Sequence, residues 1–259
     1  MNQAFKKFVA GALEKIGYSV VNRGHLQQLI AISADFEELL ALPRPHLNRL
    51  LDLAPKSKSQ MRQDLFVLSE LGFKERGYFV DFGATNGVDL NNSYLLEKEF
   101  GWTGIVAEPA KCWHEELIRN RTCNIETNCV WKESNKVLSF NEVNEPELST
   151  INAYSAADTH SPRRTKGKIF DVSTISLTDL LGKYAAPRII DFLSIDTEGS
   201  EYEILSSFDF DRYQFRVITC EHNFTDNREK IINLLTSKGY VQKFVGFSKV
   251  DSWFVCAGG

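Results

Sequence analysis

The chain has 259 residues, of which 43% are hydrophobic and 25% charged, and its formal net charge is −4. A chain of this length can form one α/β core with an appendage. The mild negative charge excludes a general attraction to nucleic acid or to an anionic membrane surface, so we expect no nucleic-acid partner. No C-x-x-C pair occurs and the cysteine count is odd, so we expect buried thiols in a reducing compartment; they are Cys112, Cys123, Cys129, Cys220 and Cys256.

Residues 1–55 have apolar side chains at intervals of three and four, which predicts a helical extension interrupted at Pro43 and Pro45. Charged residues at Glu14 and Lys15 interrupt the first apolar stretch, and no run approaches the roughly 20 apolar residues of a membrane span. We therefore expect a cytoplasmic protein, peripheral at most to the inner face of the membrane. The extension either packs on its own domain, binds a partner such as a glycosyltransferase, or contacts the membrane surface.

From residue 56 to 259 the hydrophobic periods alternate, which predicts a single α/β domain. We expect the segment 141–170 to be a loop or lid because it is polar. The last two strands are separated by a short turn and must be antiparallel. The pattern predicts a mostly parallel seven-stranded sheet with a reversed last strand, the Rossmann-like arrangement of class I methyltransferases. Strands are expected at 78–82, 103–107, 123–130, 188–196, 215–221, 240–247 and 252–256, and regular structure of either kind at 172–177. Helices are expected at 60–71, 89–100, 111–121 and 227–238. A short helix should end at 184, and another should begin near 202.

A glycine loop follows the first strand. The strand ends in Asp81, and the loop "GATNG" contains Gly83, Ala84 and Gly87, where the glycines allow a ligand to approach the backbone closely. The spacing differs from the G-x-G-x-x-G that cradles a pyrophosphate, which disfavours a nicotinamide-dependent oxidoreductase. An acid at Asp81 suits the positive charges of S-adenosylmethionine, and Glu108 at the end of the next strand can bind both ribose hydroxyls. The alternative is a turn whose glycines serve only packing.

Acidic residues and a histidine also follow two later strands. Asp196 ends one buried strand, and Glu221 and His222 end the next, so their tips should converge beside the methyl group of the cofactor. In one mechanism His222 is a general base that Asp196 or Glu221 orients. In the other, Asp196, Glu221 and His222 bind a divalent cation that activates a hydroxyl. The alternative is that these side chains cap a helix and form local salt bridges.

The polar segment "THSPRRTK" places His160, Arg163 and Arg164 close together in the sequence. It is typical of a solvated loop. Because arginine forks match anionic oxygens, binding of an anionic acceptor group such as a sugar acid or phosphate is the alternative.

The ordered motifs "SQMRQDLFVL", "GYFVDFGATNGVDLNNS", "GWTGIVAEP", "ISLTDLL", "DFLSIDTEGSEYEIL" and "EHN" resemble the FkbM-type S-adenosylmethionine-dependent methyltransferases over about residues 59–256. The resemblance implies the class I fold and methyl transfer to a hydroxyl of a sugar or natural product. It implies that Asp81, Gly83 and Gly87 contact the methionine part and Glu108 the ribose. The match further places Asn128 and Cys129 near adenine, and Gln60, Gln63 and Asp64 over the cofactor.

Asp196 and Glu221 are also similar to acids of metal-dependent sugar O-methyltransferases, although His222 stands where those enzymes carry a second acid. We therefore expect an S-adenosylmethionine-dependent O-methyltransferase, with a divalent metal ion as a further candidate cofactor. Its acceptor is expected to be a carbohydrate in a bacterial surface polysaccharide or a glycolipid. The alternatives are a non-catalytic scaffold for a glycosyltransferase and the nicotinamide-dependent oxidoreductase.

Overall fold

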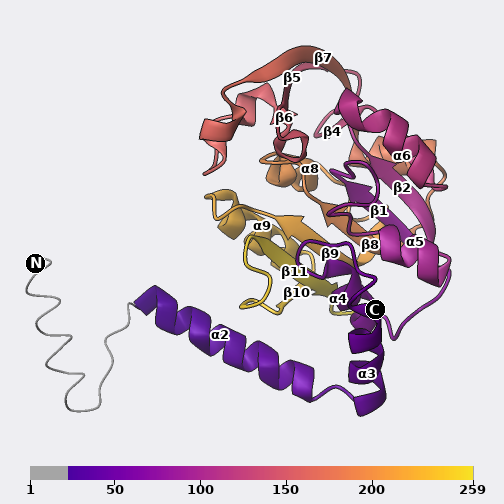
Figure 1. The fold of residues 1–259 in the computed structure, drawn as a ribbon, viewed down its shortest axis with the longest axis vertical. Helices are drawn as coiled ribbons and strands as arrows, with labels where there is room; N and C mark the ends of the chain where they lie inside the picture. Colours follow the sequence, from indigo (N-terminus) through magenta and orange to yellow (C-terminus); the bar gives the residue numbers. More distant parts are fainter. Residues whose placement is uncertain (1–22, 259) are drawn as a thin grey trace, which may run out of the picture.

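A computed structural model describes residues 23–258, which begin with helices α2 (Arg23–Leu40) and α3 (Arg44–Leu53). The helical pattern of residues 1–22 lies outside the described residues. As predicted, the break between α2 and α3 coincides with Pro43, while Pro45 occupies the first turn of α3, where a missing N–H is tolerated. Helix α2 extends away from the main sheet (Figure 1), and its Asp35 carboxylate accepts hydrogen bonds from the N–H groups of Gly246 and Phe247 at 2.7 and 2.8 Å.

The main sheet has seven strands in the order β10-β11-β9-β8-β1-β2-β3. Strand β1 pairs in parallel with β2 and β8, whereas β11 pairs antiparallel with both β9 and β10. This topology confirms the predicted class I methyltransferase fold with a reversed last strand. The strands are β1 (Tyr78–Phe82), β2 (Thr103–Ala107), β3 (Asn124–Glu126), β8 (Ile189–Ile195), β9 (Gln214–Glu221), β10 (Tyr240–Lys243) and β11 (Asp251–Cys256).

Helices cover both faces of this sheet, because side chains of a strand alternate between its two faces. Val80 of β1 belongs to one apolar cluster, together with residues of α7, α8 and α9. Its neighbour Phe79 belongs to a second cluster, which contains residues of α4, α5 and α6. The helices are α4 (Gln63–Glu70), α5 (Tyr94–Phe100), α6 (His114–Asn120), α7 (Leu177–Lys183), α8 (Glu201–Ser206) and α9 (Asn227–Ser237), and the 3-10 turn η1 (Lys111–Trp113) precedes α6.

A second sheet of four strands, in the order β4-β7-β5-β6, lies above the main sheet in Figure 1. The prediction of a loop or lid at 141–170 was therefore wrong in part, since the end of β5 and the start of β7 pair antiparallel there. The single strand expected at 123–130 is also divided, into β3 of the main sheet and β4 of the second. The elements are β4 (Cys129–Trp131), β5 (Val137–Val143), β6 (Thr150–Ile151), β7 (Gly167–Ser176) and the 3-10 turns η2 (Pro146–Leu148), η3 (Asn152–Tyr154) and η4 (Ser161–Arg164).

Among residues 23–258, none of the helices is both long and apolar enough to cross a bilayer.

Candidate active site

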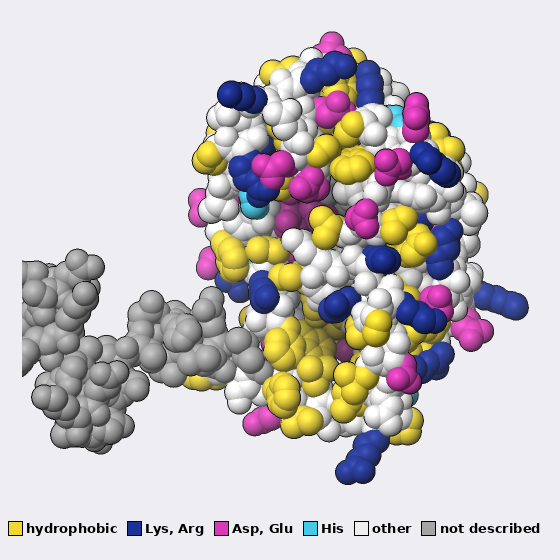
Figure 2. Space-filling model, in the orientation of Figure 1, with side chains coloured by type: hydrophobic (Ala, Val, Ile, Leu, Met, Phe, Trp, Pro, Cys, Tyr) yellow, Lys and Arg dark blue, Asp and Glu magenta, His cyan; other side chains and the backbone are white. Residues whose placement is uncertain are grey.

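A cavity of about 390 Å³ lies at the carboxyl ends of β1, β2, β8 and β9, the edge where ligands bind in open α/β sheets. Gly83, Glu108, Asp196 and Glu221 line it from the main sheet, and Ile151 lines it from the second sheet. Figure 2 shows a hollow in the upper half of the molecule with Asp and Glu side chains in and around it. These four predicted site residues of the main sheet therefore converge on one cavity.

The glycines of the loop after β1 permit two close approaches. A Cβ on Gly83, whose φ is +75°, would lie 1.9 Å from the main-chain oxygen of Asp196. A Cβ on Gly87, whose φ is +82°, would lie 2.7 Å from Cγ of Arg121 and 2.8 Å from Cδ1 of Leu117. The loop is thus held against the tip of β8 on one side and against α6 on the other. Gly83 lines the cavity, whereas Gly87 faces the protein interior.

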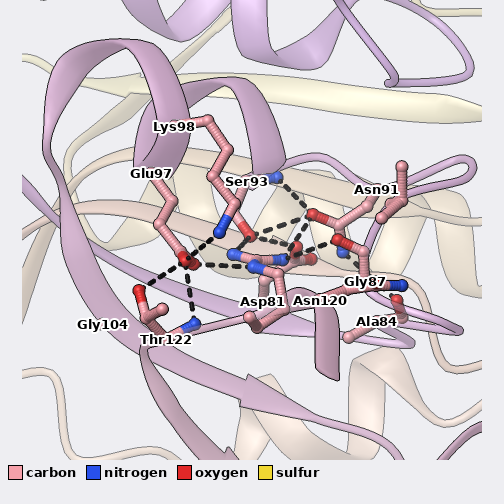
Figure 3. A network of polar contacts seen from close by, with 12 residues as sticks. Asp81, Ala84, Gly87, Asn91, Ser93, Glu97, Lys98, Gly104, Asn120 and Thr122 are labelled. Atoms are coloured by element: carbon pink, nitrogen blue, oxygen red, sulfur yellow. Dashed lines mark hydrogen bonds and ion pairs between the residues drawn. The ribbon is translucent and has the colours of Figure 1, made fainter. Parts of the chain in front are cut away.

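Asp81 does not line the cavity, contrary to the prediction that it contacts the cofactor. Its buried carboxylate accepts a hydrogen bond from the Ser93 hydroxyl at 2.6 Å, and Ser93 in turn accepts one from Arg121 at 2.9 Å (Figure 3). Burial raises the pKa of Asp81, because this site disfavours the charged form. Asp81 therefore belongs to a polar network behind the glycine loop, and Ala84, also predicted at the cofactor, is buried there rather than in the cavity wall.

Arg121 is the centre of this network. Its guanidinium donates hydrogen bonds to the Gly87 carbonyl at 3.3 Å, to Asn91 Oδ1 at 2.8 Å and to Glu97 Oε2 at 2.6 Å (Figure 3). Burial raises the pKa of Glu97, but the charge and hydrogen bonds of Arg121 outweigh it and lower that pKa to about 2. Arg121 and Glu97 join α5, α6 and the loop, and neither was predicted from the sequence.

Glu108 is placed as expected for a ribose ligand. Its carboxylate lines the cavity and accepts hydrogen bonds from the N–H groups of Thr85 and Ala110 at 2.9 and 2.8 Å. Each oxygen keeps a further lone pair for another donor. Burial, opposed by these N–H groups, raises the pKa of Glu108 to about 7.

The remaining residues expected at the cofactor divide into two groups. Gln60 and Cys129 line the cavity, and Asn128 does not. Gln63 and Asp64, in the first turn of α4, are buried away from it. Gln63 Nε2 donates to Asp251 at 2.7 Å, and the Ser57 hydroxyl donates to Asp64 at 2.7 Å. Gln63 and Asp64 therefore connect α4 to neighbouring segments and do not close over a ligand.

Three carboxylates meet at the rim. Oxygen atoms of Asp196, Glu198 and Glu221 all lie within 4.8 Å of one another. Glu221 Oε2 is buried and has no hydrogen-bond partner. Glu198, which the sequence analysis missed, follows β8 in a left-handed conformation with φ of 60° that brings its side chain back to the cavity. The sequence carried a signal for it, because three acids occur within "SIDTEGSE".

Burial and mutual repulsion favour protons on these carboxyl groups. Burial, followed by the charge of Asp251, raises the pKa of Asp196 to about 7. Burial and the charge of Asp196 raise the pKa of Glu198 to about 9 and that of Glu221 well above its usual range. Buried like charges cannot all ionise without a compensating proton or cation.

The positive charge of Arg164 compensates part of the negative charge of the carboxylate cluster. Its buried guanidinium donates to Glu198 Oε2 at 2.5 Å and to Asp158 Oδ1 at 2.9 Å, and its Nε donates to the Leu148 carbonyl at 2.8 Å. The prediction of a solvated loop is thus wrong for Arg164. His160 and Arg163 line the cavity, where the half-exposed Arg163 forms an ion pair with Glu145.

His222 is not part of the carboxylate cluster, and the prediction of a catalytic or metal-binding histidine needs correction. The Phe224 N–H donates to Nδ1 at 3.1 Å, so Nε2 carries the proton and donates to the Asp251 carbonyl at 2.9 Å. Neither nitrogen keeps a lone pair for a base or a metal. Burial and the charge of Arg228 lower the pKa of His222 to about 4, so the ring is neutral.

The solved structures similar to this chain include methyltransferases. A precorrin-6y C5,15-methyltransferase from Geobacter metallireducens is 13% identical, with a TM-score of 0.40 over 70% of this chain and 72% of that one. A putative RNA methyltransferase from Pyrococcus horikoshii is 14% identical, with a TM-score of 0.35 over 70% of this chain and 67% of that one. These similarities are too weak to support an argument about function. No curated protein matches the chain.

A family model described as the methyltransferase FkbM domain matches residues 81–242. The matched stretch contains Asp81, the glycine loop, Glu108 and all three acids of the carboxylate cluster. The chain therefore belongs to the FkbM family of S-adenosylmethionine-dependent methyltransferases.

Proposed function

We propose that the protein transfers a methyl group from S-adenosylmethionine to a hydroxyl oxygen of a carbohydrate. The observation that carries this proposal is the carboxylate cluster in the wall of the cofactor cavity. Gly83 of the cofactor loop contacts the backbone of Asp196, so the loop and the cluster are parts of one site. A sugar hydroxyl must lose its proton as it is methylated, and an acid poised near neutral pH can accept it.

The cavity suits S-adenosylmethionine as the cofactor that the family implies. Its volume of about 390 Å³ lies within the range of small-molecule sites. Glu108 has free lone pairs for ribose hydroxyls, and Phe82, Val130 and Phe140 provide apolar wall for the adenine. When bound, S-adenosylmethionine supplies an electrophilic methyl group on a sulfonium.

Asp196 takes the role of base that the sequence analysis gave to His222. With a pKa raised to about 7, its carboxyl group is partly ionised at neutral pH and can hold the proton of a hydroxyl. Without a cation in the cluster, Glu221, whose pKa burial raises well above its usual range, favours the protonated form and can donate a hydrogen bond to the acceptor. In this proposal His222 supports the backbone between β9 and β11.

Binding of S-adenosylhomocysteine tests the cofactor part. We expect saturating S-adenosylhomocysteine to raise the melting temperature of the protein, because a ligand that binds only the folded state stabilises it. The Glu108→Ala variant should show a much smaller shift, since it loses the ribose contact. Glu203→Ala, on the exposed side of α8, is the control. Absence of any shift with the unmodified protein contradicts the proposal.

We further propose that the carboxylate cluster binds a divalent cation, with Glu198 in the place that the sequence analysis gave to His222. The support is Glu221 Oε2, a buried oxygen without a partner beside two other carboxylates. Hard cations such as Mg²⁺ and Mn²⁺ prefer carboxylate ligands. Bound there, a cation would lower the pKa of a hydroxyl and orient it. Asp196, Glu198 and Glu221 would hold it.

Binding of Mn²⁺, measured by electron paramagnetic resonance and thermal shift, tests the cation without relying on turnover. We expect Mn²⁺ to bind and to stabilise the protein, and Glu221→Gln to abolish binding. His222→Asn should keep it, because the ring lies outside the cluster. If the unmodified protein binds no Mn²⁺ and chelator leaves turnover unchanged, the cluster serves only as base and hydrogen-bond donor.

A further inference from the structure

A second cavity, of about 270 Å³, lies beside the first. Tyr154, Ala157 and Asp158 line it from the connection between β6 and β7. Thr225 of the β9–α9 connection and Lys230 of α9 line it as well. We propose that this second cavity binds a sugar ring of the acceptor, and that it selects a neutral or N-acetylated sugar over a sugar acid or phosphate. This inference rests on the proposed O-methyltransferase function.

The rim segment 197–201 separates the two cavities. Glu198 and Ser200 line the first cavity, whereas Gly199 and Glu201 line the second. The cavities have Glu221 and Asn223 in common, and these residues belong to both walls. A ligand in the second cavity therefore borders the carboxylate cluster.

The sizes of the cavities favour one ligand in each. About 390 Å³ is near the lower end of the 300–1,000 Å³ typical of a site for one small molecule. A cofactor that fills the first cavity leaves little room there for a sugar. The second cavity supplies the missing volume on the side of Glu221, where a hydroxyl can reach the cluster.

The second cavity also has the side chains that bind sugars. Tyr154 offers an aromatic face, on which the apolar C–H face of a sugar ring can pack. Gly199 leaves room for Tyr154, since a Cβ there would lie 3.1 Å from Cβ of Tyr154. Thr225, Asn227 and Lys230 add hydroxyl, amide and ammonium groups that can hydrogen-bond to ring hydroxyls.

The charges of the lining residues determine which sugars fit. Asp158, Glu201, Glu221 and Asp226 are acidic, and Lys230 is the basic residue in the wall. Arg164 lies behind Asp158 but is already bound to two carboxylates. A carboxylate or phosphate on the acceptor would lie among these four acidic side chains, and both repulsion and the need to protonate the acids disfavour its binding. This argues against the anionic acceptor considered from the sequence, because Arg164 is bound to acids of the protein and Arg163 lines the first cavity instead of the second.

Saturation-transfer NMR on the protein saturated with S-adenosylhomocysteine tests the inference. The probes are methyl glucoside, methyl N-acetylglucosaminide and methyl glucuronide. We expect saturation transfer to at least one of the first two and none to the glucuronide. Tyr154→Ala, which removes the aromatic face, and Ala157→Trp, which fills the cavity, should each abolish the signal. Phe224→Ala, an exposed aromatic in the β9–α9 connection that does not line the cavity, should keep it.

All variants must keep the thermal shift with S-adenosylhomocysteine, which shows that the fold and the first cavity are intact. The inference is overturned if no glycoside gives a signal, if the glucuronide is preferred, or if the signal survives both Tyr154→Ala and Ala157→Trp. A protein that binds the glycosides but not S-adenosylhomocysteine would contradict the proposed function while keeping the sugar site.

Discussion

At the scale of single residues, Gly83 has the most demanding position in the site. It has a positive φ, and any Cβ would collide with the main-chain oxygen of Asp196 at 1.9 Å. The oxygen belongs to the backbone at the tip of β8, so relief of the clash requires the two strand ends to separate. Gly72 has a similar φ of +59° but nothing within 4 Å of its Cβ position, so the two glycines differ in steric surroundings alone.

This contrast gives a prediction. Gly83→Ala should destabilise the protein by clearly more than the roughly 1 kcal/mol that an αL alanine costs, and it should also abolish S-adenosylhomocysteine binding. Gly72→Ala should lose only the free energy that an alanine in the αL conformation costs, and it should still bind S-adenosylhomocysteine. Urea unfolding and thermal shift measure the two effects. Equal losses of stability in both variants would show that the loop does not need its contact with β8.

The sequence predicts which residues lie at the sheet edge when they follow directly after a strand. It predicts less well the direction in which their side chains point. Asp196, Glu108 and Glu221 follow apolar strands and meet at the expected edge. His222 was wrongly predicted to join the carboxylate cluster. Adjacent side chains of an extended chain point to opposite sides, so Glu221 lines the first cavity whereas His222 lines only the second. The three acids of "SIDTEGSE" indicated that an acid follows β8, but not the direction of Glu198, because a left-handed turn and not a strand determines it.

At the scale of elements, the ion pair of Glu97 and Arg121 joins α5 to α6 behind the glycine loop. Both side chains are buried, with exposed fractions of 4% and 0%. Glu99, on the same helix, pairs with Lys56 at the surface, where the side chains are 39% and 54% exposed. The two pairs have similar chemistry and differ in burial.

We predict that Glu97→Gln costs about 3–5 kcal/mol, because it leaves the Arg121 charge buried with less compensation. Glu99→Gln should cost less than about 1 kcal/mol, as surface pairs do. Chemical unfolding of both variants measures the difference. A loss in Glu97→Gln no larger than that in Glu99→Gln would mean that Asp81 and water compensate Arg121.

The second sheet was the element that the sequence did not reveal. Strands of the main sheet are covered on both faces and appear as apolar runs, which makes them recognisable. Strands β5 and β7 have exposed residues such as Val137 and Ile169 among polar ones, so their pattern resembles a loop. Their pairing joins residues up to 36 apart in sequence, from Val137 to Ser173, and no local pattern reports such a contact.

At the scale of the whole molecule, buried acids make stability depend on pH. Burial raises the pKa of Glu108 and Asp196 to about 7 and that of Asp251 to about 6. Unfolded carboxyl groups titrate near pH 4, so the folded protein keeps protons that the unfolded chain has lost. The resulting stabilisation is complete below pH 4 and is lost as pH rises through 7. His222, with its lowered pKa, has the opposite effect, but only below about pH 6.5.

We therefore predict that the melting temperature of the ligand-free protein falls between pH 6.5 and pH 8.5. Each kcal/mol lost corresponds to about 2–4 °C in a protein of this size. Glu108→Gln removes one of the titrating groups, so its melting temperature should fall less over the same range. Scanning calorimetry at a series of pH values measures both slopes. A melting temperature that rises with pH would contradict the assignment of protonated buried acids.

The second sheet and its connections occupy one uninterrupted stretch of chain, residues 129–176, between the strands that hold the cofactor. That stretch supplies Tyr154, Ala157 and Asp158 to the second cavity and Val130 and Phe140 to the first, whereas Gly83, Glu108, Asp196 and Glu221 lie outside it. Within that stretch, residues 152–159 contribute to the wall of the second cavity and not to that of the first, so natural variation confined to them can alter which acceptor is used while leaving the methyl-donor half of the site unchanged. A chimera that exchanges only residues 152–159 between two members of the family is the corresponding route to a redesigned specificity.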